Sequence, residues 1–161
     1  MQLRFTAILM MLVLVFCPRL MASGKAENKF IASFHMQSDE NDNPKMIFPQ
    51  LTNGKTLYFR RMPEVSTKDI VAFSPFPSDV GEGYGVVFQL KDNAAKRLMA
   101  ITNFNQGRWM LAEVNGRAVD GVLIDKPVSD GMLVIWKGVT LEDITLFEKS
   151  LPRIGQEGKK K

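Results

Sequence analysis

GRWMLAEVNGRAVDGVLIDKPVSDGMLVIWKG, residues 107–138, is the stretch that decides the fold of this chain. Trp109–Val114 predicts a strand that ends at Asn115-Gly116, a dipeptide typical of a two-residue hairpin, because both turn residues need a positive φ. Arg117–Ile124 predicts the returning strand. Met132–Lys137 predicts a third strand, and because this run is apolar on both faces we expect it at the centre of a sheet.

Strand patterns also occur upstream of this stretch. Alternating, β-branched and aromatic residues predict strands at 30–36, 55–61 and 84–90, and a short apolar piece at 46–48 begins another. The even-numbered residues from Phe30 to Met36 share one face of the first strand, so we expect them in the core. Asn53-Gly54 separates two of these runs and predicts a second hairpin.

Two stretches have the periodicity of amphipathic helices. The first is 94–102, for which Asp92 or Asn93 can serve as the cap. The second begins at Thr140, which has the capping-box spacing to Asp143. The order of strands and helices predicts an α+β fold, with a mainly antiparallel sheet and helices packed on one face.

Residues 1–24 have the order of a secretory signal peptide. Arg4 precedes an uncharged run from Phe5 to Cys17, and small residues follow at 22–24. The run is shorter than the roughly 20 apolar residues that a transmembrane helix needs. We therefore expect a periplasmic or secreted protein. The alternative is an uncleaved N-terminal anchor, which would then be the only part that touches the membrane.

Removal of this leader changes the composition of the chain. Cys17 is the single cysteine, so the mature chain would have no disulfide and no thiolate site. Arg4 and Arg19 are the only charges in the leader, so the basic residues fall from 21 to 19 against 17 acidic residues. A nearly neutral exported chain argues against nucleic-acid binding. We expect residues 25–154 to form one domain and residues 155–161, which end in three lysines, to be a disordered basic tail.

The residue inventory offers little catalytic chemistry. His35 is the one histidine, and no motif of a hydrolase accompanies it. Asp39, Asn41 and Asn43 have the spacing of a calcium loop, but Pro44 takes the place of the glycine that such a loop needs. We therefore expect no catalytic residue, no metal and no cofactor. A periplasmic small-ligand binder or enzyme that uses His35 is the alternative.

Aromatic and basic residues in residues 107–138 predict a partner-binding surface, because Trp and Arg are frequent anchors of protein interfaces. The candidates are Arg108, Trp109, Asn115, Gly116, Arg117 and Trp136. A core position for both tryptophans is the alternative, because large aromatic side chains dominate protein cores.

Residues 84–151 resemble the head part of the first large periplasmic domain of the SecD and SecDF translocon subunits. The matching motifs are, in order, the strand Gly85–Leu90, the helix motif Asn93–Leu98 with Thr102-Asn103, the strand and turn Met110–Val119, the stretch Lys126–Val128 with 131–138, and the helix start Thr140–Asp143. Val65–Ile70 is similar to the turn that the family places before its first strand. Val114-Asn115 departs from the Leu-Asp that the family usually has before the turn glycine. The motifs are structural glycines, caps and apolar positions, so the resemblance implies a fold and no catalytic residue.

The resemblance also implies a small exported domain that contacts polypeptide or an envelope protein. SecD and SecDF are polytopic membrane proteins, and this sequence has no transmembrane bundle, so their coupling of proton-motive force to export does not carry over. We expect a non-enzymatic binding or accessory module in the cell envelope. Its partner would be a protein, either a translocon subunit or an exported polypeptide held along an exposed strand edge.

Overall fold

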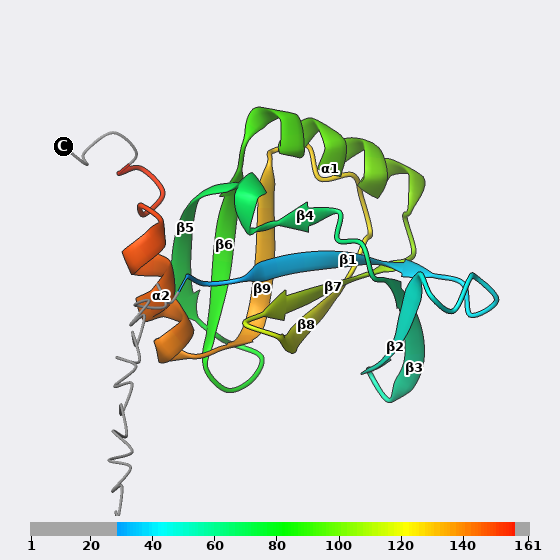
Figure 1. Ribbon diagram of the computed structural model, residues 1–161. Helices are drawn as coiled ribbons and strands as arrows, with labels where there is room; N and C mark the ends of the chain where they lie inside the picture. The colour runs from blue at the N-terminus through cyan, green and yellow to red at the C-terminus, as the bar shows by residue number, and fades with distance from the viewer. Residues whose placement is uncertain (1–28, 157–161) are drawn as a thin grey trace, which may run out of the picture.

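The computed structural model describes residues 29–156, which form two β-sheets and two α-helices (Figure 1). The larger sheet has six strands in the order β2-β3-β1-β7-β8, with β4 paired to β1, and the smaller sheet has the order β5-β6-β9. Every strand pair within the two sheets is antiparallel. The α+β class predicted from the sequence is confirmed.

The larger sheet is built from β1 (Ala32–Ser38), β2 (Ile47–Thr52), β3 (Lys55–Arg60), β4 (Val65–Ser66), β7 (Trp109–Val114) and β8 (Arg117–Leu123). The smaller sheet is built from β5 (Ile70–Pro77), β6 (Tyr84–Leu90) and β9 (Met132–Val139). A short 3-10 helix, η1 (Thr67–Asp69), joins β4 to β5, and the α-helices are α1 (Asp92–Phe104) and α2 (Leu141–Ser150).

Both predicted hairpins are confirmed. Asn115 and Gly116 join β7 to β8 with φ angles of 50° and 77°. Asn53 and Gly54 join β2 to β3 with φ angles of 49° and 73°. These values are those of a two-residue turn with both central residues in the left-handed region, which is why Asn-Gly occurs at each position.

The prediction that β9 lies at the centre of a sheet is wrong. This strand pairs with β6 and lies at the end of the smaller sheet, whose central strand is β6. The inner face of β9 is apolar because it packs in the core, where Ile135 is fully buried. Its outer face is apolar although it is open, and the side chain of Trp136 is 50% exposed. Apolar residues on both faces therefore marked a strand with an accessible apolar face, not a central strand.

The two helices differ in how they begin. Thr140 caps α2 as predicted, because its Oγ1 accepts the Asp143 N–H at 3.2 Å and the Asp143 carboxylate accepts the Thr140 N–H at 3.0 Å. The cap predicted for α1 is wrong, because Lys91 is the N-cap and Asp92 is already helical. The Lys91 N–H donates to the Asp69 carbonyl at 2.9 Å, so a tertiary contact sets the start of α1.

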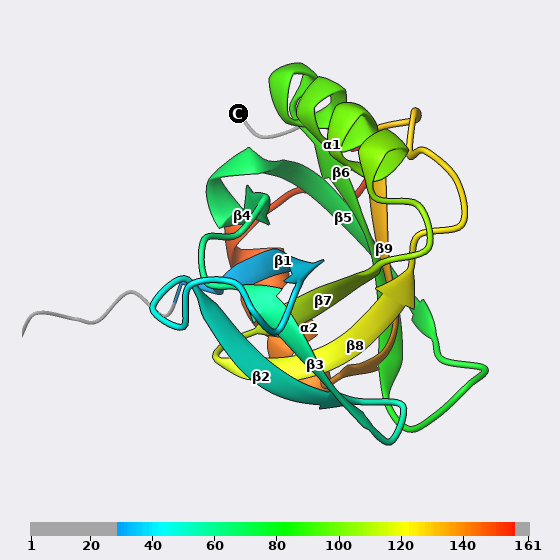
Figure 2. The ribbon, with the colours of Figure 1, turned by 90° about the vertical axis from the view of Figure 1, so that its right-hand side faces the viewer.

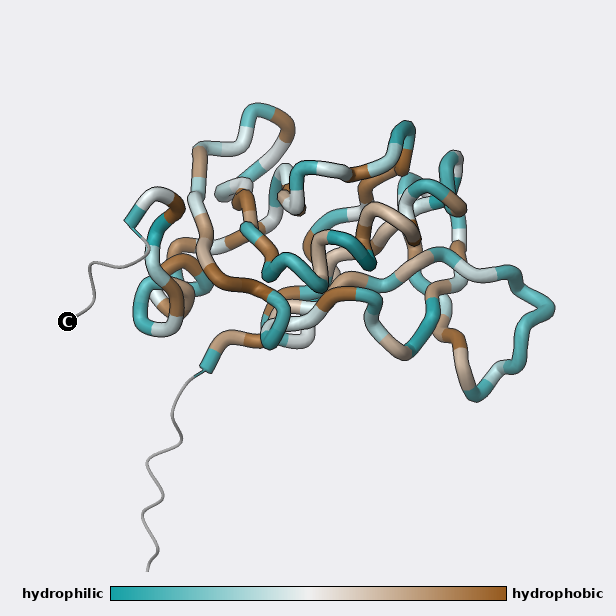
Figure 3. The backbone as a smooth tube through the Cα atoms, turned by 90° about the horizontal axis from the view of Figure 1, so that it is seen from above, coloured by the Kyte–Doolittle hydropathy of each residue, from teal (hydrophilic) through white to brown (hydrophobic). Residues whose placement is uncertain are grey.

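The core lies between the two sheets and α2, and aromatic rings fill it. The Phe147 ring of α2 meets the rings of Phe30, Phe73 and Phe88 edge to face, at centroid distances of 4.9, 5.5 and 5.3 Å. The even-numbered residues from Phe30 to Met36 are at most 2% exposed, as their alternation predicted. Hydrophilic stretches occupy the outer loops, and hydrophobic stretches run through the middle of the molecule (Figure 3).

Two sequence-based predictions concern the ends of the chain. The predicted signal peptide, residues 1–24, lies outside the described residues, as does the predicted basic tail after Gln156. The Gln156 N–H donates to the Arg153 carbonyl at 2.9 Å, so the described chain ends in a turn. Within residues 29–156, no helix combines the length and the apolar character needed to cross a membrane.

Candidate functional site

A mostly apolar groove of about 430 Å³ lies between β8 and β9, the end strands of the two different sheets. The loop of residues 124–131 joins these strands and runs beside α1 (Figure 2). Residues 124–130 of this loop line the groove. The most deeply buried apolar lining residues are Phe34, Met110 and Ala112, and the walls include Val122, Leu123, Met132, Val134 and Trp136. The volume lies within the roughly 300–1,000 Å³ that is usual for ligand pockets.

At one end of the groove, the Asp120 side chain connects β8 to β9. The Trp136 N–H of β9 donates to Oδ2 of Asp120 on β8 at 2.8 Å, and Oδ1 accepts the Gly121 N–H at 3.0 Å. The backbones also approach closely there, because a Cβ at Gly138 would lie 2.7 Å from the Val119 carbonyl oxygen. Gly138 has a φ of 81°, so glycine suits this position for both reasons.

The open edges of β8 and β9 differ from the other sheet edges. The edge of β5 is covered, because the Phe73 N–H donates to the Pro152 carbonyl at 3.1 Å and the Ile154 N–H donates to the Phe73 carbonyl at 3.0 Å. The edge strand β2 contains Pro49, which blocks ladder formation. In the described part of the chain, β8 pairs only with β7 and β9 only with β6, and neither strand contains a proline. The two least protected edges therefore face each other across an apolar groove.

Large apolar side chains reach the surface at this groove. Leu123 is 46% exposed and Trp136 is 50% exposed. The Trp136 ring contacts Phe76 of β5 edge to face, with centroids 6.0 Å apart. Exposed apolar residues that gather in one groove are typical of binding sites, whereas single ones are not informative.

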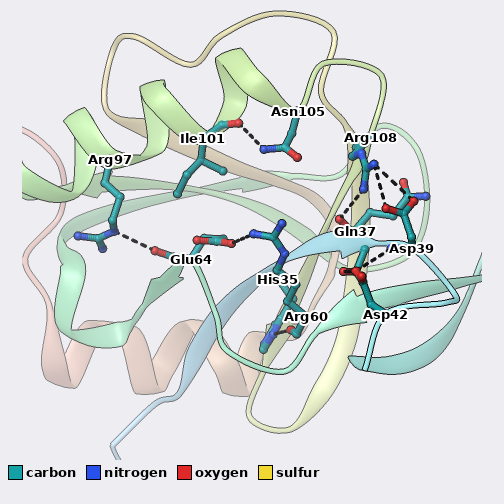
Figure 4. Close-up of polar contacts among 11 residues, drawn as sticks. His35, Gln37, Asp39, Asp42, Arg60, Glu64, Arg97, Ile101, Asn105 and Arg108 are labelled. Carbon is teal, nitrogen blue, oxygen red and sulfur yellow. Dashed lines mark hydrogen bonds and ion pairs between the residues drawn. The ribbon is translucent and has the colours of Figure 1, made fainter. Parts of the chain in front are cut away.

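The six predicted partner-binding residues lie in three places. Arg108 and Trp109 are at the start of β7, where the Arg108 guanidinium is 3.3 Å from the Asp39 carboxylate (Figure 4) and the Trp109 N–H donates to the Gln37 side chain at 2.9 Å. Asn115, Gly116 and Arg117 are at the opposite end of β7. Only Trp136 lines the groove. The structure does not bring the six residues together, and their role in binding stays a prediction.

The Asn115-Gly116 turn is anchored to α2. Asp143, which is 4% exposed, accepts the Asn115 Nδ2–H at 2.7 Å and the Arg117 Nη2–H at 2.5 Å. Asn115 Oδ1 also accepts the Ile31 N–H at 2.9 Å. Burial raises the pKa of the Asp143 carboxyl, but the hydrogen bonds from Thr140 and Asn115 and the Arg117 charge outweigh it and hold that pKa below its ordinary value. The polar atoms of this turn therefore stabilise the fold.

His35, the alternative candidate, is buried in β1 and has partners at both ring nitrogens. Nδ1 lies 2.7 Å from the Arg60 carbonyl oxygen and Nε2 lies 2.9 Å from the Ser33 hydroxyl, with the Glu113 carboxylate 3.6 Å away. The Phe48 ring packs against the imidazole edge to face, at 5.4 Å. His35 does not line the groove between β8 and β9. These contacts are those of a histidine that holds β1 against β3.

Sequence reasoning missed most of the groove. Leu123, Met132 and Val134 were predicted as ordinary strand residues, because their accessible faces depend on which strands pair. The turn-forming residues Ser129-Asp130-Gly131 were the available signal, since they lie between β8 and β9.

The fold and the groove together define a class of protein: a small α+β module with two open strand edges on either side of an apolar groove. No protein-family model matches the chain, and no curated protein matches it. The chain is similar to solved structures, among them two of SecDF. One is of SecDF, described as a membrane component that enhances protein export; the TM-score is 0.53, the identity 15%, and the match covers 77% of this chain. The other is a crystal structure of SecDF in the super-membrane-facing form, with a TM-score of 0.52, an identity of 15% and a match over 76% of this chain.

This chain spans 64% of the length of the first of those chains and 19% of the second. At such low identity the likeness concerns the fold, and the SecDF-like fold that residues 84–151 implied is confirmed.

Proposed function

We propose that this chain is a non-enzymatic polypeptide-binding module that serves protein export, and that it holds an extended segment of another polypeptide in the groove between β8 and β9. The observation that carries the proposal is that β8 and β9, each at the end of its sheet, lie on either side of an apolar groove. Strand edges offer backbone hydrogen bonds to any extended chain, and the groove offers burial for apolar side chains.

The chemistry of the groove favours an unfolded polypeptide over a folded partner. A folded protein buries its apolar side chains and pairs its backbone internally, so it has little to offer a narrow groove. A polypeptide in transit exposes both apolar side chains and unpaired backbone. The likeness to SecDF, whose description concerns protein export, supports this choice of partner.

The proposal includes the location of the module outside the cytoplasm. Residues 1–24 have the pattern of a signal peptide, which would place the module in the periplasm or outside the cell. Fractionation of cells and the mass of the mature N-terminus test this part. An intact N-terminus in the membrane fraction would mean that the module is anchored and does not diffuse freely. The groove would then act at the membrane surface.

Photo-crosslinking tests the binding proposal. A photo-reactive amino acid at Leu123 reports on the groove, and the same residue at Lys149, exposed on α2, is the matched control. We expect Leu123 to crosslink to polypeptides that are in transit and to lose these products when export is blocked, whereas Lys149 gives few. Equal products at both positions, or none at Leu123, would overturn the proposal.

A binding measurement with purified protein complements the cellular test. The probe is a reduced and alkylated polypeptide that cannot refold, labelled with a fluorophore. We expect the mature chain to bind this probe and not a folded protein of similar size. Binding to phospholipid vesicles in place of the unfolded probe would assign the groove to lipid and exclude the export role.

A further inference from the structure

The direction of the backbone groups along β9 follows from one hydrogen bond. The Leu90 N–H of β6 donates to the Gly131 carbonyl at 3.0 Å. In an antiparallel ladder the backbone groups of successive residues face opposite sides, so the odd-numbered residues up to Ile135 face β6. The even-numbered residues from Met132 to Trp136 therefore direct their N–H and carbonyl groups toward the groove.

Aspartate side chains already occupy two of these three N–H groups. The Met132 N–H donates to Asp130 Oδ1 at 3.0 Å, and the Trp136 N–H donates to Asp120 Oδ2 at 2.8 Å. Both contacts agree with the alternation deduced above. Val134 lies between them with its N–H and its carbonyl both directed into the groove, where no described residue pairs with them. Along this edge of β9, Val134 therefore has an N–H that is unpaired within the described residues, and the N–H groups of Met132 and Trp136 on either side of it are occupied by aspartates.

The facing edge of β8 is shorter. The Ile124 N–H donates to the Arg108 carbonyl at 2.9 Å, so Leu123 directs its backbone groups toward the groove by the same alternation. The Gly121 N–H is capped by Asp120, and the register of β8 shifts between the partners Ala112 and Glu113. The edge of β9 therefore has the longer run of backbone groups directed toward the groove.

We infer that the groove takes its polypeptide as an added antiparallel strand on β9, centred on Val134. This inference rests on the proposed function and states how it works. The ligand residue opposite Val134 exchanges two hydrogen bonds with it, and ligand residues two positions away donate to the carbonyls of Met132 and Trp136. The intervening ligand residues direct their N–H groups away from β9 and their side chains toward the buried base of the groove, near Leu133 and Met110.

This arrangement defines the class of ligand. Recognition through the main chain tolerates many sequences, and the groove then selects apolar side chains at alternate positions. The caps at Asp120 and Asp130 limit the paired segment to the length of residues 132–136. A helix is excluded because its backbone groups are already paired. The ligand is a short extended segment of alternating character, of the kind found in the strands of proteins before they fold.

Single N-methylation of a peptide tests the inference without altering the protein. The probe is a fluorescent peptide in which two valines flank one threonine. Glycines and lysines form both ends, so that the peptide binds in a single register on β9. The threonine pairs with Val134 and the valines enter the groove. We expect N-methylation of the threonine to weaken binding about five- to tenfold, the effect of about one lost hydrogen bond. N-methylation of the second valine, which removes an N–H that faces away from β9, should change affinity by less than about twofold.

The protein supplies a second test. Val134→Pro removes the N–H that faces the groove, and Val134→Ala keeps it while shortening the side chain. If the two variants are equally stable to heat, we expect Val134→Pro to weaken binding of the unmodified peptide at least about fivefold more than Val134→Ala does. Equal affinity of the two methylated peptides would overturn strand addition while leaving a groove that binds polypeptide. Failure of every unmethylated probe to bind would overturn the proposed function itself, so the two failures are distinguishable.

Discussion

Asp120 on β8 accepts the backbone N–H of Trp136 on β9 at 2.8 Å, and this contact joins the ends of two sheets that share no ladder. The same carboxylate accepts the Gly121 N–H, so one side chain occupies an outward N–H on each strand. The groove begins where this contact ends. Asp120 therefore sets both the closed end of the groove and the limit of the open edges.

Asp120→Ala should destabilise the protein by about 1–2 kcal/mol, because two backbone N–H groups lose a charged acceptor at a partly exposed site. Urea unfolding at neutral pH measures the change. Asp125→Ala is the control, since Asp125 is exposed in the adjoining loop and should change stability by less than about 0.5 kcal/mol. Equal effects of the two substitutions would show that the contact between Asp120 and Trp136 contributes nothing.

Gly138→Ala should cost more than Gly107→Ala, although the two glycines have nearly the same φ, 81° and 80°. Both substitutions strain the backbone by about 1 kcal/mol. A Cβ at position 138 would also lie 2.7 Å from the Val119 carbonyl oxygen, whereas nothing lies within 4 Å of one at position 107. We expect an additional loss of about 1–3 kcal/mol at Gly138 from this overlap, measured by thermal unfolding. Matching losses would mean that β8 and β9 separate freely at this end.

Leu123→Asp should weaken binding of the unfolded probe at least about tenfold without loss of stability, because Leu123 is 46% exposed and lines the groove. Leu51→Asp is the matched control, since Leu51 is 68% exposed on β2, away from the groove. Fluorescence anisotropy measures both affinities. An equal loss for the two variants would point to nonspecific charge repulsion and not to the groove.

The Asp143 carboxylate should stabilise the fold in a pH-dependent way. Its pKa is lowered in the folded protein, so its contribution is fully present above the unfolded pKa of about 4 and is lost as the pH falls through the lower folded value. Asp143→Asn should therefore reduce stability at pH 7, and the difference from the unaltered protein should shrink at pH 3. Urea unfolding at both values tests this. A difference that is constant with pH would contradict the role of the charge at the Asn115-Gly116 turn.

His35→Ala should reduce stability by about 1–3 kcal/mol, because it leaves a cavity and removes the partners of Arg60 and Ser33. We expect the affinity for the unfolded probe to stay within about twofold, since His35 does not line the groove. Loss of binding in a variant that remains folded would revive the alternative in which His35 belongs to the functional site.

The local elements were predictable because their causes are local. Asn115-Gly116 needs two left-handed residues, and Thr140 and Asp143 satisfy each other across one turn, so both could be read without tertiary information. The start of α1 was not predictable in this way. Lys91 is held by the Asp69 carbonyl, a partner distant in the sequence, and this contact overrides the preference for Asp92 or Asn93 as the cap.

The candidate site was predictable only at Trp136. Aromatic and basic residues pointed to six positions, but Asn115 and Arg117 donate to Asp143, and Arg108 pairs with Asp39. Residue type alone does not show whether a polar group is already paired within the fold.

The sequence by itself determined the α+β class, both Asn-Gly hairpins and the buried face of β1, because periodicity and turn chemistry act over a few residues. The likeness to the SecDF fold came from the resemblance of residues 84–151 to that family. Tertiary structure alone decided that β9 pairs with β6 and leaves β8 at the end of the other sheet. Strand pairing joins residues far apart in the chain, and a strand carries the same apolar pattern whichever neighbour it has. The groove between β8 and β9 exists because these two strands, neighbours in the sequence, do not pair.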